Sequence, residues 1–137
     1  MVGIGNPLVK KKIIKEIRNS NIIFPTIVHP SVIVYDPEFV RFGRGVVIGA
    51  NTVLTTNIIL KDYVYVNHGV MLSHDVEVAK YSMLMPNVII SAGARIGESV
   101  YLGNSVTIEQ PVIIPNNIRV PIGTILTNQK SVEELQN

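Results

Sequence analysis

Hydrophobic residues recur along this chain with a period of six. Each of the fourteen hexapeptides that follow Gly45 has Ile, Leu or Val at its third position, from Ile48 to Leu126. The first position is Val or Ile in most units and a smaller residue in the others. A fixed six-residue repeat is typical of a parallel β-helix, in which every unit supplies one short strand. The pattern therefore predicts an all-β fold around a narrow core of aliphatic side chains.

The repeat also divides the chain into regions. It begins at Thr26 with the units TIVHPS, VIVYDP and EFVRFG, which put Val28, Val34 and Val40 at the third position. Two further residues, Arg44 and Gly45, precede the long run and are interpreted as an insertion at a corner. We therefore assign residues 1–25 to a strand–helix segment, 26–129 to the β-helix domain and 130–137 to a C-terminal tail.

The two ends of the chain follow other patterns. Met1 to Gly5 is interpreted as a short strand, and Pro7 to Ser20 has helical spacing. Asn6 before Pro7 predicts the start of that helix, because Asn caps helices well and Pro fits their first turn. Its apolar side is expected to hold Val9, Ile13, Ile14 and Ile17. Residues 131–136 are expected to form a turn of helix that covers the open end of the coil.

The outward-facing positions predict an assembly. Three hexapeptides make one coil, so residues eighteen apart stack on one another. The second positions then form three columns: Val47, Tyr65, Met83, Tyr101 and Arg119; Val53, Met71, Ile89, Thr107 and Ile125; Ile59, Glu77, Arg95 and Ile113. Two columns are largely apolar, and apolar faces of this extent are usually buried. We expect a homotrimer that buries two faces of each subunit against its neighbours; a monomer with exposed apolar faces is the alternative.

Composition narrows the function classes. The chain has 137 residues, which suits one domain, and a formal net charge of +2, which does not suggest a nucleic-acid partner. Lys10, Lys11, Lys12 and Lys15 are interpreted as one polar helix face. There is no cysteine, and therefore no disulfide or thiolate nucleophile. We find neither a membrane-spanning run nor a signal peptide, so we expect a cytoplasmic protein without membrane contact.

The candidate chemistry lies at the corners of the coil. His74, followed by Asp75, falls at the corner between an apolar face and the charged face, at the rim of the expected subunit interface. A neutral imidazole beside a carboxylate is a good general base; a surface histidine with a turn aspartate is the alternative. His68 falls on the corner expected to face the three-fold axis, as an interface histidine or an axial ion ligand. We predict no metal site.

The stretch from Val64 to Gly97 resembles the core of the bacterial sialic-acid O-acetyltransferases and nucleotide-amino-sugar N-acetyltransferases. The resemblance is carried by the N-x-G-x-x-x-x-H-D run and by a Pro-Asn corner twelve residues after the histidine. The segment FPTIVHPS, residues 24–31, resembles the start of their β-helix. Val2 to Asn6 and the basic helix resemble the last strand and helix of their N-terminal nucleotide-binding domain, most of which this chain lacks.

This resemblance implies a left-handed parallel β-helix and transfer of an acetyl group from acetyl-CoA to a sugar or nucleotide-sugar acceptor. His74 would be the catalytic base and Asp75 its carboxylate neighbour. Asn67 would lie near the acceptor, and the Ala92 N–H would meet the thioester carbonyl. Acetyl-CoA would lie in the groove between subunits, past Ala92, Gly93 and Gln110.

The chain departs from the family in two ways. It has no counterpart of the Gly-rich loop that helps to hold the nucleotide, and Met83 stands where several members have a second histidine. Two alternatives to a sugar acetyltransferase therefore stay open: a non-catalytic trimeric scaffold, and an acetyltransferase for a small non-nucleotide acceptor. The three-histidine pattern of the zinc-binding β-helix carbonic anhydrases is missing.

Overall fold

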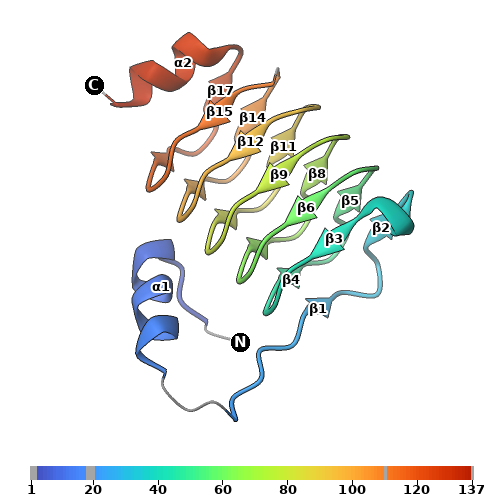
Figure 1. Ribbon diagram of the computed structural model, residues 1–137. Coiled ribbons are helices and arrows are strands. Elements are labelled where there is room, and N and C mark those ends of the chain that lie inside the picture. Colours follow the sequence, from blue (N-terminus) through green and yellow to red (C-terminus); the bar gives the residue numbers. More distant parts are fainter. Residues whose placement is uncertain (1–2, 18–20, 110, 137) are drawn as a thin grey trace.

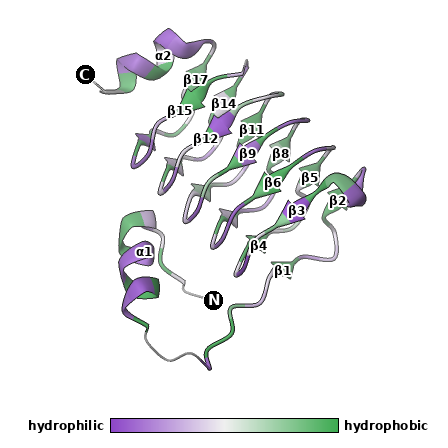
Figure 2. Cartoon of the chain, viewed as in Figure 1, coloured by the Kyte–Doolittle hydropathy of each residue, from purple (hydrophilic) through white to green (hydrophobic). Residues whose placement is uncertain are grey.

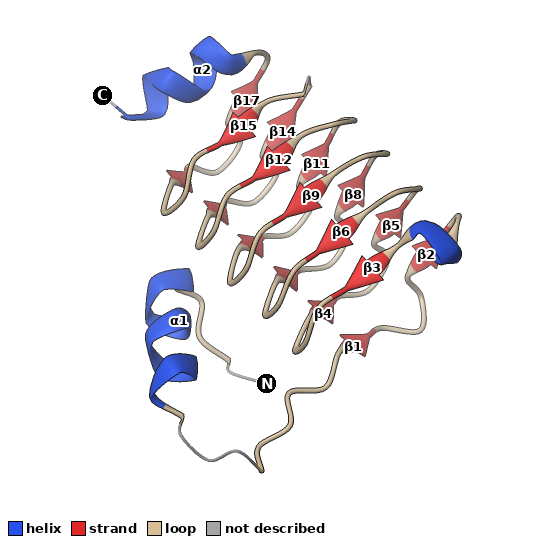
Figure 3. Ribbon diagram, viewed as in Figure 1, coloured by secondary structure: helices blue, strands red, loops and turns tan. Residues whose placement is uncertain are grey.

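The computed structural model describes residues 3–17, 21–109 and 111–136. They form a parallel β-helix with one helix beside it and a second over its C-terminal end (Figure 1). Each strand is two residues long (Figure 3). After each strand the chain turns at a corner, so that the next strand lies on the next side of a triangular coil. No helix in this part of the chain is long and apolar enough to cross a membrane.

The strands form three parallel sheets, one on each side of the triangle. Sheet A contains β1 (Ile27–Val28), β4 (Val47–Ile48), β7 (Tyr65–Val66), β10 (Met83–Leu84), β13 (Tyr101–Leu102) and β16 (Arg119–Val120). Sheet B contains β2 (Ile33–Val34), β5 (Val53–Leu54), β8 (Met71–Leu72), β11 (Ile89–Ile90), β14 (Thr107–Ile108) and β17 (Ile125–Leu126). Sheet C contains β3 (Arg41–Phe42), β6 (Ile59–Leu60), β9 (Glu77–Val78), β12 (Arg95–Ile96) and β15 (Ile113–Ile114).

The register confirms the three outward columns expected from the repeat. Tyr65, Met83 and Tyr101 are paired neighbours in sheet A. Third-position side chains point inward, and from Ile48 to Leu126 each is at most 2% exposed. Sixth-position residues such as Asn51 and Asn57 have positive φ, a conformation that Asn and Gly adopt at least cost.

The insertion lies elsewhere than expected. Arg41 and Phe42 pair with Ile59 and Leu60, eighteen residues on, whereas Val34 pairs with Leu54, twenty residues on. The two extra residues therefore lie before Arg41, in the 3-10 helix η1 (Pro37–Phe39), and not at Arg44 and Gly45. Val40 consequently occupies a first position and Phe42 a third position. The assignment of Val40 to the third position was wrong because Pro37 starts an extra turn.

The first helix, α1 (Pro7–Glu16), starts as the sequence predicts and ends earlier. The Asn6 side chain accepts hydrogen bonds from the N–H groups of Leu8 and Val9, and Pro7 occupies the first turn. The helix ends at Glu16; the expected end at residues 18–20 lies outside the described residues. Residues 3–5, the described part of the expected N-terminal strand, are irregular.

The buried side of α1 differs from the expected one. Pro7, Lys10 and Ile14 are buried, whereas Val9 is exposed. Lys10 is only 4% exposed, so it does not belong to a solvated polar face as the sequence suggested. Ile14 of the helix packs against Tyr63 and Tyr81 at the corner between sheets C and A. The rings of these two tyrosines are stacked, with their centres 5.3 Å apart. This contact sets which side of α1 faces the β-helix.

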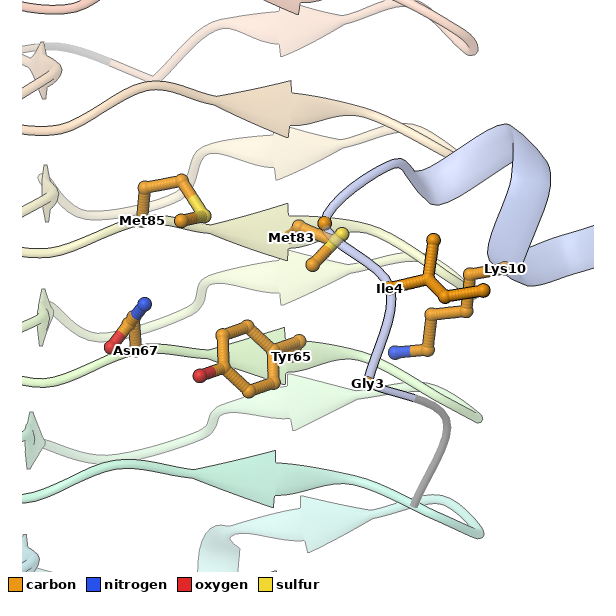
Figure 4. Close-up of a pocket in the computed structure, with 8 residues that line it drawn as sticks. Gly3, Ile4, Lys10, Tyr65, Asn67, Met83 and Met85 are labelled. Atoms are coloured by element: carbon orange, nitrogen blue, oxygen red, sulfur yellow. The ribbon is translucent and has the colours of Figure 1, made fainter.

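Part of the apolar face of sheet A is covered by the N-terminal segment, which runs beside the β-helix (Figure 2). Met83, in the middle of sheet A, is 4% exposed and lies under the chain at Gly3 and Ile4 (Figure 4). The chain's own N-terminal segment therefore covers part of this face, and the expected trimer remains a prediction. Sheet B keeps an open apolar face, on which Ile89 is 42% exposed. On sheet C, Glu77 accepts from Arg95 at 3.1 Å and pairs with Lys61, which confirms the charged column.

The C-terminal end of the coil is covered as expected, by α2 (Gln129–Glu133) and the 3-10 helix η2 (Glu134–Gln136). Val132 is buried against the last coil. The Gln129 side-chain amide bonds both the N–H and the C=O of Ile113, at 2.9 and 3.1 Å. It thereby replaces a missing strand at the edge of sheet C.

Candidate active site

His74 and Asp75 form a hydrogen-bonded pair at the corner that follows β8. The Asp75 Oδ2 atom lies 2.7 Å from His74 Nδ1. Both side chains are more than half exposed, so a substrate can reach them. An ionised carboxylate at Nδ1 favours the tautomer with its proton on that nitrogen, which leaves Nε2 as the acceptor of a substrate proton. This arrangement suits a general base.

A third residue, Asn57, completes the pair. Its side-chain amide donates to Asp75 Oδ1 from the equivalent corner one coil earlier. The hydrogen bond from His74, followed by that from Asn57, lowers the pKa of Asp75 below its ordinary value. The carboxylate is therefore ionised at neutral pH, as a partner for the imidazole must be. Sequence reasoning missed Asn57, although its spacing of eighteen residues from Asp75 predicts that the two stack.

The corner one coil beyond His74 presents a backbone donor. The Gly93 N–H donates to the His74 carbonyl at 2.9 Å and is therefore occupied. The Ala92 N–H makes no hydrogen bond to any residue that the structure describes. A free N–H beside a base is the kind of group that stabilises negative charge on a carbonyl oxygen. Gln110, the third residue expected along this groove, lies outside the described residues.

Asn67 lies apart from His74 within one subunit. It follows β7, whereas His74 follows β8, so the two occupy the corners at opposite ends of one sheet B strand. Asn67 instead lines a cavity of about 210 Å³ between sheet A and the N-terminal segment. Figure 4 shows Tyr65, Met83 and Met85 on the floor of this cavity, with Gly3 and Ile4 crossing beside it.

The same cavity contains a buried cation, Lys10. Its Nζ donates to the Tyr63 carbonyl at 2.5 Å and lies 6.0 Å from the centre of the Tyr65 ring. No carboxylate of the described residues forms an ion pair with it. Burial lowers the pKa of Lys10 to about 8, because the charged amine loses its hydration. Sequence reasoning missed this group, since three consecutive lysines and Lys15 suggested a solvated face.

The other two histidines have local partners. His68 is exposed, and its ring Nδ1 lies 2.9 Å from Asn67 Oδ1. The His29 Nδ1 lies 2.9 Å from the Ser31 hydroxyl. Within the described ranges, no three His, Asp or Glu side chains gather as a metal site requires. His74 is thus the histidine whose partners fit a base.

No protein-family model and no curated protein sequence matches this chain. Solved structures do match. PerB from Caulobacter crescentus, in complex with CoA and GDP-perosamine, superposes with a TM-score of 0.85 at 25% identity, over 91% of this chain and 59% of its own. The acetyltransferase domain of PglB from Neisseria gonorrhoeae, in complex with acetyl coenzyme A, gives 0.58 at 20% identity, over 90% and 61%. WeeI from Acinetobacter baumannii gives 0.55 at 18% identity, over 85% and 64%.

These similarities confirm the fold that the sequence resemblance implied. They extend over nine tenths of this chain in the first two cases, but over only about three fifths of the PerB and PglB chains. The rest of those proteins has no counterpart in this sequence. The repeat, the three parallel sheets and these superpositions together show that the chain is a hexapeptide-repeat parallel β-helix, similar in fold to these proteins.

Proposed function

We propose that this protein transfers an acetyl group from acetyl-CoA to an amine or hydroxyl of a sugar, with His74 as general base. The observation that carries the proposal is the pair of His74 and Asp75 beside the Ala92 N–H, which bonds none of the described residues, at an open corner of the β-helix. The similarity to structures that contain CoA or acetyl coenzyme A supports the choice of cosubstrate. A sialic acid or a nucleotide-linked amino-sugar is the proposed acceptor class.

The proposed reaction is a direct transfer. His74 Nε2 takes the proton of the acceptor amine or hydroxyl as that group attacks the thioester carbonyl carbon. The Ala92 N–H donates to the carbonyl oxygen as it gains negative charge. The protonated imidazole, held by Asp75, then returns its proton to the sulfur of the leaving CoA. The products are the acetylated acceptor and free CoA, and no cysteine is present to carry an acyl intermediate.

The proposed assembly is a homotrimer, because a trimer brings His74 of one subunit close to the Asn67 and Lys10 cavity of the next. A three-fold ring packs one surface of each subunit against a different surface of the next. If the open apolar face of sheet B meets the sheet A side of the next subunit, His74 at the edge of sheet B approaches the neighbour's α1. The cavity with Asn67 and Lys10 lies there. His74 from one subunit and Asn67 from the next would then face one acceptor. Acetyl-CoA and nucleotide sugars are cytoplasmic metabolites, so we place the reaction in the cytoplasm.

Thiol release tests this function. Purified protein is incubated with acetyl-CoA and, in separate reactions, sialic acid, free amino-sugars and their nucleotide forms, and free CoA is measured. Acceptor-dependent release supports the proposal and identifies the acceptor class. Failure to bind acetyl-CoA in a calorimetric titration, with no release for any acceptor, would contradict it and favour the non-catalytic scaffold.

A further inference from the structure

The cavity between the N-terminal segment and sheet A contains a lysine, Lys10, with which no carboxylate of residues 3–17, 21–109 and 111–136 forms an ion pair. Lys10 is 4% exposed, and its amine is directed toward Tyr65 between Gly3 and Ile4 (Figure 4). The amine has three donors, and in the described structure only the Tyr63 carbonyl accepts from it. Removing an ammonium group from water is unfavourable unless a partner compensates. One neutral carbonyl compensates poorly, so the site is incomplete as it stands.

The residues around the Lys10 amine favour a negatively charged ligand. The cavity is lined by Tyr65, Met83, Met85 and the backbone of residues 3–5, with no carboxylate among its lining residues. Asn67 lines it from the far side of Tyr65, and its Oδ1 already accepts from the His68 N–H at 2.8 Å. The Asn67 amide N–H groups are therefore the donors that it can offer a ligand. A cation in a cavity that no described carboxylate lines favours an anionic oxygen group as its ligand.

The size of the cavity limits what enters it. Its volume is about 210 Å³, below the roughly 300–1,000 Å³ of pockets that enclose a whole ligand. It therefore fits one end of a ligand, such as a charged sugar ring. A single cation neutralises a single negative charge. This favours a carboxylate, a phosphodiester or one phosphoryl group of a diphosphate diester, each of which carries one charge, over a doubly charged phosphate monoester.

From this geometry we propose that Lys10 binds a singly charged anionic group of the acceptor while Asn67, on the other side of Tyr65, donates to an uncharged part of it, so that this cavity selects sugar acids or nucleotide-linked sugars over neutral sugars. The proposal rests on the proposed function, because it assigns the acceptor end of that site. Lys10 acts here as a binding residue through direct contact with the acceptor, whereas proton transfer stays with His74.

The test measures binding without turnover. Sialic acid and its methyl ester are titrated calorimetrically into the wild-type protein, Lys10→Met and Lys10→Arg; the ester has the same ring without the charge. A nucleotide-linked sugar, titrated beside the corresponding neutral sugar, distinguishes a phosphodiester from a carboxylate. Methionine keeps the length and apolar stem of lysine, and circular dichroism spectra establish that each variant is folded.

We expect the wild-type protein to bind one of the charged probes more tightly than its neutral counterpart. Lys10→Met should weaken that charged probe roughly tenfold or more, leave the neutral one unchanged, and be partly rescued by arginine. The proposal is wrong if the wild-type protein binds charged and neutral probes equally, or if Lys10→Met weakens both alike. Thiol release is assayed separately, so a failed anion site and a failed acetyltransferase give different results.

Discussion

The side-chain amide of Asn57 donates to the Asp75 carboxylate from one coil below, so that two corners of the β-helix jointly hold His74. Both residues occupy the sixth position of their units, with φ of 52° and 62°. The left-handed backbone at these stacked corners places the amide and the carboxylate in contact. The orientation of His74 therefore depends on the eighteen-residue spacing that stacks Asn57 on Asp75.

Asn57→Gly should lower kcat roughly two- to tenfold with little change in KM, because it removes one hydrogen bond that orients Asp75. Glycine avoids strain at the positive φ of this position. Asn51→Gly, at another sixth position with φ of 58°, is the matched control and should keep full activity. Equal loss in both variants would mean that the effect comes from the backbone, and that Asn57 has no role in orienting Asp75.

Ile89→Glu should dissociate the proposed trimer, because it places a charge in the centre of the open apolar face of sheet B. Ile113→Glu is the matched control, since Ile113 is also an outward-facing strand residue but lies on sheet C. Sedimentation velocity should show monomers only for Ile89→Glu, with loss of activity if neighbouring subunits share a site. A trimer that survives the Ile89 substitution would place the interface elsewhere.

Lys10 should make the protein more stable as pH rises. Its pKa falls from 10.5 to about 8 on folding, so between these values the unfolded chain binds more protons than the native one and stability increases with pH. From pH 7.5 to 9.5 the gain should be about 2 kcal/mol. Among the residues lining the two cavities beside Lys10, the other titratable groups are Tyr63 and Tyr65.

Denaturant unfolding at both pH values checks this expectation. The protein concentration is held constant, because the proposed trimer would couple assembly to folding. Lys10→Met lacks the titrating amine, so the difference in unfolding free energy between wild type and variant should move in favour of the wild type by that amount. An unchanged difference would show that the pKa of Lys10 is not lowered.

Gly43→Ala should destabilise the first coils by about 1–3 kcal/mol, because an added Cβ would lie 2.5 Å from the Asp62 nitrogen and 2.7 Å from the Lys61 carbonyl carbon. Gly5→Ala is the control, since no atom lies within 4 Å of its Cβ. Thermal unfolding measures both. A neutral Gly43→Ala would contradict the close approach of residue 43 to the next coil.

The repeat predicts most of the fold because a period of six fixes which side chains face inward. The three outward columns follow from the eighteen-residue spacing alone, and the structure confirms each of them. The misplaced insertion shows the limit of this reasoning. A run of aliphatic residues fits two registers near Val40, whereas the tight approach of Gly43 to the next coil fits only one. Glycine at the fourth position, as at Gly49, was the signal that could have decided the register.

The candidate site was predictable in part. His74, Asp75 and Ala92 lie together at stacked corners, as their spacing indicates. Lys10 was not predictable, because its burial depends on how α1 rotates against Tyr63 and Tyr81. Such tertiary packing overrides the polar character of the helix sequence. The covering of Met83 by residues 3–5 has the same cause.

The central claim is that His74 is the base of an acetyl transfer. It is tested most directly by acceptor-dependent thiol release from acetyl-CoA, comparing His74→Ala with His29→Ala, a control that removes an exposed histidine at the start of the coil. We predict that His74→Ala lowers kcat roughly 100- to 10,000-fold without altering acetyl-CoA binding or the oligomeric state, and that His29→Ala leaves kcat unchanged. Turnover at the wild-type rate in His74→Ala would contradict the account.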